Sequence, residues 1–434
     1  MNPVIIGVIG IVVLIILLFM RIPVSFVMLL VGFVGFSVIN SVDGGLTLLA
    51  KDFWGIFSSY NLGTLPMFIF MGTLAFYSEI SGRLYGVAYK FVGHYRGGLA
   101  IATTLACALF GAVCASTVAS AAAMGKVTLP EMKKYNYDDS LATGCVAAAG
   151  SLAIMIPPSG TLIVYGSIVE QSIGKLFAAG ILPGVLLTIL FIMTVYILCR
   201  INPGLAPAGI KSSWGERLKS LNGVIEMLLL FALVMGGMFV GWFTPTEAGA
   251  IGAAGALAIA LVRRSLSRQG FQKALGEATR ISAMVFLILA GATLFGRFMA
   301  ISRIPFVLSD WIGGLGVSPT MVMTFIIIAY IGAGCFMDSL AMITLTVPIL
   351  FGVVTGLGFD PIWFGIIIVL VVEMGAITPP VGINVFTIKG VAPDVPMNTI
   401  FRGIWPFVGA EIVCTILVVA FPEIILFLPR LITY

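Results

Sequence analysis

Long apolar segments, separated by short polar loops, run along almost the whole chain. Several of them approach the roughly 20 residues that an α-helix needs to cross a bilayer. The first segment, 1–20, has neither a basic leader nor a small-residue cleavage motif, so we expect it to be retained as a membrane span. The pattern predicts an all-α polytopic membrane protein.

Two of these segments are interrupted by the same pattern, Pro157-Pro158-Ser159-Gly160 and Pro379-Pro380-Val381-Gly382, one in each half of the chain. Proline lacks a backbone donor and clashes with the preceding turn, so a double proline followed by glycine unwinds a helix. We therefore predict broken transmembrane helices over about 139–172 and 361–388. Irregular backbone at membrane depth is tolerated where it lines a cavity, and matched broken helices in two halves are typical of a transporter site.

The spacing between the two double prolines recurs almost unchanged at other landmarks. The matching positions are Pro23 and Pro245, Gly111 and Gly332, and Gly180 and Gly403. A nearly constant period over almost the whole chain indicates two copies of one unit. We predict a first repeat at 1–200, a cytoplasmic linker at 201–222 and a second repeat at 223–434.

Basic residues predict the orientation. The most basic loops, 200–222 and 263–280, are expected in the cytoplasm. Segment 98–130 has positive charge on both sides and a small, polar centre, which favours a re-entrant helical hairpin. Each repeat then crosses the membrane an odd number of times, so the second repeat is inverted and its hairpin, 319–348, enters from the opposite face. Both chain termini are predicted to be periplasmic.

The hairpin tips and the helix breaks carry the polar oxygen atoms that hold sodium ions. We expect each tip to face the break of its own repeat and to bind sodium there, with substrate between the two sites. Sodium site 1 is predicted at Ser116, Thr117, Ser120, Met155, Ser159 and Gly160. Sodium site 2 is predicted at Gly332, Asp338, Ser339, Thr378, Pro379, Gly382 and Asn384. Predicted substrate contacts are Ser116, Pro158, Ser159, Thr161, Asp338, Pro380 and Asn384.

A single hydroxyl in a membrane helix usually bonds its own i−4 carbonyl, so only the clustering at matched tips favours a site. Asp338 is the strongest candidate, because a carboxylate at the membrane centre costs about 2.5–3.5 kcal/mol. Glu373 is either a proton carrier or a structural contact, and we favour the structural role. Glu247 is expected to cap a helix. Trp363 is one of several aromatic residues expected as interfacial anchors.

Composition supports the membrane assignment. Hydrophobic residues make up 60% of the 434 residues and charged residues 9%, against about 25% in a soluble domain. The six cysteines lack metal-ligand spacing and are expected to be buried free thiols. The net charge of +5 is concentrated in loops, so we expect a lipid environment and no nucleic-acid partner.

The chain resembles the large membrane subunit of tripartite ATP-independent periplasmic (TRAP) transporters. The likeness covers nearly the full length and depends on segments 111–117, 153–159, 334–338 and 377–384. The resemblance implies an elevator-type secondary transporter in the bacterial inner membrane, driven by two or more sodium ions. It also implies that a soluble periplasmic binding protein delivers an organic acid such as a C4-dicarboxylate or a sialic acid. The small four-span membrane subunit is expected as a separate polypeptide.

Three other functions share some of these features. Proton coupling in place of sodium coupling remains open at this stage. An ion channel can also use re-entrant tips, but it does not need a broken helix opposite each tip. An enzyme needs a nucleophile with a base, metal ligands or paired acids, and the sequence shows one histidine and no close pair of acids at membrane depth. We therefore expect no enzymatic activity.

Overall fold

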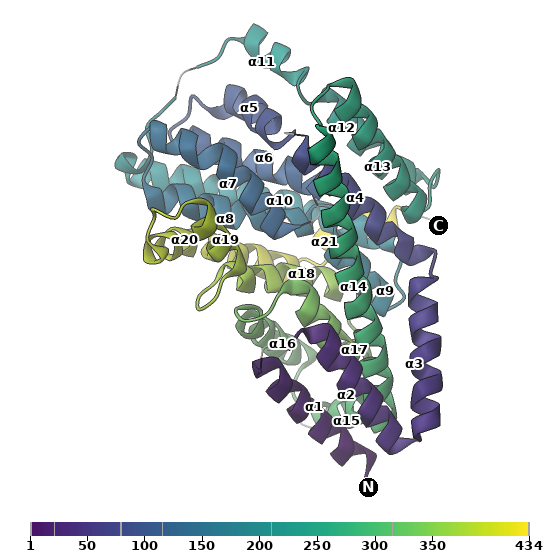
Figure 1. The fold of residues 1–434 in the computed structure, drawn as a ribbon. Coiled ribbons are helices and arrows are strands. Elements are labelled where there is room, and N and C mark those ends of the chain that lie inside the picture. Colours follow the sequence, from purple (N-terminus) through teal and green to yellow (C-terminus); the bar gives the residue numbers. More distant parts are fainter. Residues whose placement is uncertain are drawn as a thin grey trace.

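The computed structural model describes residues 2–432 except 21, 79, 115, 210 and 315. The elements within this part are helices, and the only β-type pairing among them is an isolated antiparallel bridge between Arg96 and Ala208. Within the described ranges, five helices are long and apolar enough to cross a membrane, or up to seven if each of two bent helix pairs forms one span. The fold is therefore that of an all-α multi-pass membrane protein (Figure 1).

The first half of the chain contains the helical elements before the linker. They are α1 (Pro3–Phe19), α2 (Val24–Ile39), α3 (Val42–Phe57), η1 (Asn61–Gly63), α4 (Thr64–Tyr77), α5 (Ile80–Val92), α6 (Gly98–Cys114), α7 (Thr117–Lys134), α8 (Asp139–Met155), α9 (Gly160–Ile168) and α10 (Ile173–Ile201). The predicted hairpin corresponds to α6 and α7, and the predicted broken helix to α8 and α9, whose axes differ by 42°.

The predicted linker contains η2 (Pro203–Leu205) and α11 (Trp214–Leu221). The helices after it are α12 (Ile225–Val240), α13 (Pro245–Val262), α14 (Arg268–Ser302), α15 (Ile304–Gly314), α16 (Pro319–Gly334), α17 (Ser339–Gly356), α18 (Pro361–Ile377), α19 (Ile383–Val391), α20 (Met397–Ala420) and α21 (Glu423–Arg430). The predicted second hairpin corresponds to α16 and α17, and α17 extends beyond the predicted end at 348. The predicted second broken helix corresponds to α18 and α19, while the other bent pair is α11 and α12, whose axes differ by 55°.

Most helices begin at a residue that can accept a hydrogen bond from the free N–H groups of the first turn. At α13, Thr244 and Glu247 form a reciprocal capping box, in which each side chain accepts from the backbone N–H of the other. The prediction that Glu247 caps a helix is confirmed.

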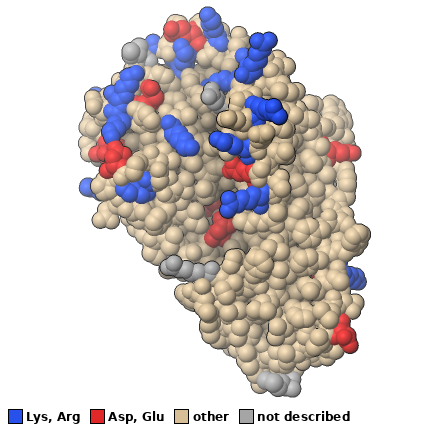
Figure 2. Space-filling view, in the orientation of Figure 1, with Lys and Arg blue, Asp and Glu red and all other residues tan. Residues whose placement is uncertain are grey.

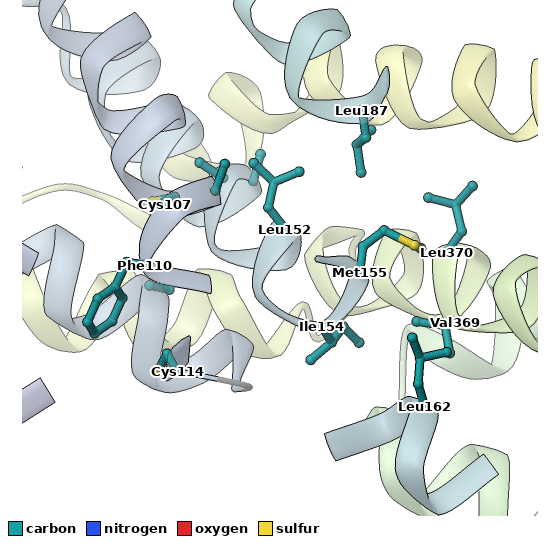
Figure 3. Close-up of a cluster of buried hydrophobic side chains, with 14 of the residues drawn as sticks. Cys107, Phe110, Cys114, Leu152, Ile154, Met155, Leu162, Leu187, Val369 and Leu370 are labelled. Carbon is teal, nitrogen blue, oxygen red and sulfur yellow. The ribbon is translucent and has the colours of Figure 1, made fainter. Parts of the chain in front are cut away.

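The buried apolar residues form two separate cores. The larger one includes the hairpins and the broken helices, and Figure 3 shows part of it, in which Met155 of α8 points toward Leu370 of α18. The smaller core joins α1, α2 and the second half of α14 through residues such as Met28 and Phe298. In Figure 1 these three helices lie together at the end of the molecule that carries the N-terminus.

The structure confirms the expectation for the six cysteines and contradicts the one for Trp363. All six cysteines are buried and free, as predicted. Trp363 is not an interfacial anchor: its side chain is buried, and its indole Nε1–H donates to the carbonyl of Val418 at 3.3 Å. The prediction was wrong because nearness to the end of a span does not show whether a neighbouring helix covers the ring.

The two halves of the chain also meet at a loop. The Lys133 ammonium, near the end of α7, pairs with Asp394, which follows α19. This hydrogen bond lowers the pKa of Asp394 below its usual range. Both side chains are exposed, so the pair contributes little to stability.

Candidate functional site

A cavity of about 610 Å³ lies where the two hairpin tips meet. Its wall combines residues from both halves of the chain, which are far apart in the sequence. The polar lining residues are Ser25, Thr73, Ser116, Thr117, Thr161, Glu277, Asp338 and Ser339. Six predicted site residues therefore share one cavity: Ser116, Thr117, Gly160, Thr161, Asp338 and Ser339.

The first tip lies between Cys114, the last residue of α6, and Thr117, the first residue of α7. Ser116 caps α7, because its hydroxyl accepts from the backbone N–H of Ala119 at 3.4 Å. Ala115, which is part of the motif in this tip, lies outside the described residues. Ser120 is fully buried one turn along α7 and is not among the residues that line the cavity.

The first break separates Met155, at the end of α8, from Gly160, at the start of α9. Ser159 caps α9 by accepting from the N–H of Leu162 at 3.3 Å. The Met155 carbonyl oxygen would lie 2.6 Å from a β-carbon at Gly180, so it faces α10. Pro158 lines a small gap with Met71, away from the large cavity.

The first hairpin packs tightly on the first broken helix. A β-carbon at Gly111 would lie 2.6 Å from the Ala153 Cα, and one at Gly150 would lie 2.8 Å from the Ala121 Cβ. Only small residues allow the backbones of α6 and α7 to approach α8 this closely. The predicted placement of this tip beside its own break agrees with these contacts.

The second tip contacts α18 in a similar way. A β-carbon at Gly375 would lie 2.5 Å from the carbonyl carbon of Gly334, the last residue of α16. Asp338 caps α17 and is exposed to the cavity; its Oδ2 accepts from the N–H of Leu340 at 3.2 Å. Ser339 donates its hydroxyl proton to Glu373 of α18 at 2.9 Å, which ties the tip to the second broken helix.

The predicted residues at the second break do not line the cavity. The Thr378 hydroxyl donates to the carbonyl of Met374 at 2.5 Å, the bond that is usual for a helical threonine. Asn384 is fully buried against α8, where its Nδ2 donates to the carbonyl of Ala147 at 3.3 Å. Four other predicted residues of site 2 or of the substrate contacts are also not among those that line the cavity: Gly332, Pro379, Pro380 and Gly382.

The opposite wall of the cavity was missed by sequence reasoning. It consists of residues from α2, α4 and α14, including Glu277, whose Oε2 accepts from the Tyr77 hydroxyl at 2.8 Å. Glu277 lies in a segment that was assigned to a basic cytoplasmic loop. The sequence feature that could have identified Glu277 is a polar residue on an otherwise apolar face of the helix.

Sequence reasoning also missed Glu411 in α20. Its side chain is completely buried, and Oε1 accepts from the Ser151 hydroxyl at 3.2 Å. Glu373 of α18 is buried as well, so two carboxylates lie inside the packed helices. The signal was present in the sequence, since a carboxylate inside an apolar helix is functional by default.

Three helix N-termini end at the cavity, those of α7, α9 and α17. Each carries a partial positive charge that attracts anions. Among the described lining residues, Asp338 and Glu277 are acidic and none is a lysine, an arginine or a histidine. The arrangement can therefore hold small cations at its oxygen atoms and a carboxylate at its helix ends.

The family model of the tripartite ATP-independent periplasmic transporter, DctM component, matches residues 11–424. The chain belongs to this family. A TRAP subunit of this kind is a transporter permease and not an enzyme.

Several proteins of this family are similar to the chain over most of their length. The C4-dicarboxylate TRAP transporter large permease protein DctM of Pseudomonas aeruginosa is 37% identical, and the match covers 86% of each chain. The sialic acid TRAP transporter large permease protein SiaM of Vibrio cholerae is 32% identical, with 96% of each chain covered. The ectoine/5-hydroxyectoine TRAP transporter large permease protein UehC of Ruegeria pomeroyi is 33% identical over 95% of this chain and 96% of its own.

Among solved structures, the YdaH transporter of Alcanivorax borkumensis superposes with a TM-score of 0.63, covering 88% of this chain and 90% of that one. The two sequences are 13% identical, so the likeness concerns the fold alone.

Proposed function

We propose that this TRAP subunit is the membrane component of a sodium-coupled importer of organic acids. The substrate class includes C4-dicarboxylates, sialic acids and similar carboxylates, in line with the names of its relatives. The observation that carries the proposal is the cavity in which two hairpin tips from distant parts of the chain meet the second half of a broken helix.

Sodium binds at the tips in this proposal. Hydroxyl oxygens of Ser116 and Thr117 serve the first site, and Asp338 with Ser339 serves the second. The nearby breaks add backbone carbonyl oxygens. Hard cations prefer such neutral oxygens with a single carboxylate, and an Asp at this depth needs a cation to offset its charge.

The substrate carboxylate binds between the tips, at the N-termini of α7, α9 and α17. Bound sodium raises the affinity for the carboxylate, because it neutralises Asp338 and adds positive potential beside the anion. Substrate and sodium therefore bind with positive coupling, which is the thermodynamic requirement of a symporter.

The elevator prediction is supported by the position of the cavity. The moving part would contain the hairpins and broken helices, α6–α9 and α16–α19, and the scaffold would contain other spans, including α1–α4 and α12–α14. The cavity lies at the boundary, with one wall from each part. The smaller core within α1, α2 and α14 gives part of the proposed scaffold a packing centre of its own.

The inverted-repeat prediction is supported by the matching order of helices. The second hairpin begins at Pro319 and the first at Gly98, while the second broken helix begins at Pro361 and the first at Asp139, so the two offsets are nearly equal. Figure 2 shows Lys and Arg side chains concentrated over the half of the molecule that carries α11 and α5, opposite the beginning of α1. We infer that this charged end faces the cytoplasm of a bacterial inner membrane and that the chain termini are periplasmic.

The small four-span subunit and the periplasmic binding protein are the expected partners, since the family is tripartite. Two relatives, an isethionate permease named DctMQ and a sialic acid permease named SiaT, are longer chains of which the match covers 58% and 67%. We propose that a separate small subunit contacts the exposed apolar scaffold helices of this chain.

The test is uptake by proteoliposomes that contain the subunit and its small partner, supplied with the binding protein. Labelled succinate, N-acetylneuraminate and ectoine are offered with an inward sodium gradient or with choline in its place. We expect saturable uptake of one of these compounds only when both sodium and the binding protein are present. Uptake that persists without sodium and collapses with the pH gradient would instead establish proton coupling. Sodium current without solute would indicate a channel.

A further inference from the structure

Two buried carboxylates lie outside the cavity and have no basic partner. Glu373 of α18 is 1% exposed and Glu411 of α20 is 0% exposed. Each uses one oxygen to accept a hydroxyl proton, from Ser339 and from Ser151 respectively. Neither takes part in any of the ion pairs found among the described residues.

The second oxygen of each carboxylate, Oε2, is buried and has no hydrogen-bond partner among the described residues. An unpaired buried charge costs several kcal/mol even after relaxation. Glu373 lies on α18, which packs against α20, the helix that carries Glu411, and against α8, the helix that carries Ser151. Each carboxylate therefore needs either a bound cation or a proton, because it forms no ion pair with a basic side chain among the described residues.

A third free oxygen comes from Asn384 of α19. Its amide orientation is determined, because Nδ2 donates to the Ala147 carbonyl, and its Oδ1 is buried without a partner in the described part of the chain. Ala147 and Ser151 lie one turn apart on α8, and Ser151 donates to Glu411. Asn384 and Glu411 therefore bind neighbouring positions on one face of α8, which brings the amide group near the Glu411 carboxylate.

We propose that Glu373, Glu411 and Asn384 hold a monovalent cation, sodium in the cell, at a site separate from the hairpin tips. Three free oxygens and two carboxylate charges suit a small hard cation in a site that excludes water. Calcium takes about six to eight oxygen ligands, more than this site offers, and magnesium usually retains several waters. The ion sits between α8, α18, α19 and α20, so it joins the two broken helices.

This site is connected to the cavity by one hydroxyl group. Ser339 lines the cavity and donates to Glu373, so the chain of contacts runs from the second tip to the buried ion. Sodium at the tip and sodium at the buried site then influence each other through Ser339, and the coupling is reciprocal. The buried ion holds the broken helices together while the tips exchange their ions.

The test counts sodium ions bound to the purified subunit, using radioactive sodium at equilibrium. Glu411→Gln is the informative variant, because Glu411 belongs to no tip site and glutamine has nearly the same shape. We expect this variant to bind one ion fewer than the wild type. Asp338→Asn, which changes the tip, should retain the buried ion and lose a different one. A wild-type ion count in Glu411→Gln would overturn the proposal.

Infrared spectroscopy of the wild type tests the site without any variant. We expect no C=O stretching band of a protonated carboxylic acid in sodium chloride, and a change in the carboxylate bands when choline replaces sodium. A protonated-acid band that persists in saturating sodium and disappears in Glu411→Gln would show that protons occupy the pair, and would overturn the cation assignment. These readouts need no transport, so they remain informative if sodium-coupled uptake is not observed.

Discussion

Asp338 combines two functions that are normally separate. It caps α17 through a backbone hydrogen bond and also presents a carboxylate to the cavity. A cap is worth about 1 kcal/mol, and asparagine can replace aspartate in that role. The charge, in contrast, cannot be replaced by a neutral side chain. The two contributions can therefore be separated by one substitution.

We predict that Asp338→Asn leaves the thermal stability nearly unchanged and weakens sodium affinity at least about 10-fold, the lower bound for disturbing a metal site. Sodium dependence of uptake and calorimetric unfolding provide the two measurements. Asp360→Asn is the matched control, since Asp360 caps α18 in the same way and is not a cavity residue. Wild-type sodium affinity in Asp338→Asn would count against a ligand role for this carboxylate.

A single glycine can also decide whether the backbones of two helices approach each other closely. A β-carbon at Gly403 of α20 would lie 1.8 Å from the Ser140 carbonyl oxygen of α8. The contact of α20 with α8 is therefore possible only without a side chain, and it places Glu411 beside Ser151. Small residues have this role in membrane helices because lipid provides no hydrophobic force that drives helices together.

At the level of elements, the helix breaks and not the straight helices create the site. α8 and α9 are separated by Ile156–Ser159, and their axes differ by 42°. The bend exposes the N-terminus of α9 to the cavity. A continuous helix would have no free N–H groups at this depth.

We predict that the double variant Pro157→Ala with Pro158→Ala joins α8 and α9 and removes the α9 N-terminus from the cavity. The sodium concentration for half-maximal uptake should rise about 10-fold or more. Pro406→Ala is the control, because Pro406 lies inside α20, which is already continuous. If the double variant shows unchanged sodium and substrate affinities, the break is merely tolerated and does not form the site.

At the level of the whole molecule, the proposed scaffold and the proposed moving part meet at a tight contact. A β-carbon at Gly72 of α4 would lie 2.7 Å from the carbonyl oxygen of Cys114 in the first tip. Gly72 is thus a point where the proposed moving part passes close to the scaffold.

We predict that Gly72→Ala shifts the balance between transport states by about 1–3 kcal/mol, the usual cost of overpacking. Uptake should slow while sodium binding by the purified subunit is retained. Gly86→Ala in α5 is the control, since a β-carbon there meets nothing within 4 Å. Equal uptake by the two variants would argue against sliding at this contact.

Membrane orientation is also a property of the whole molecule. We predict that cysteines introduced at Lys211 and Lys273 react with an impermeant maleimide only from the cytoplasm, because basic loops remain on that side. A cysteine at Trp311, which is 61% exposed, should react from the periplasm. The native cysteines are all buried, so the background should be low. Labelling of position 211 from outside would reverse the assigned orientation.

The elements of this protein could be predicted from local sequence. Apolar length predicted the membrane helices, the double prolines predicted both breaks, and the polar segments around Ser116 and Asp338 predicted both tips. These signals are local, because a missing N–H group or a turn residue acts on its own stretch of backbone. The same segments also indicated the transporter family.

Only the tertiary structure decided which polar atoms meet. It placed Glu277 across the cavity from the tips and Asn384 against α8, and it buried Glu373, Glu411 and Trp363. Helices that are hydrophobic all round give no periodic signal that shows which face will be covered. Contacts between the two halves of the chain therefore depend on how the helices pack, which is determined by close backbone approaches such as those at Gly111, Gly375 and Gly403.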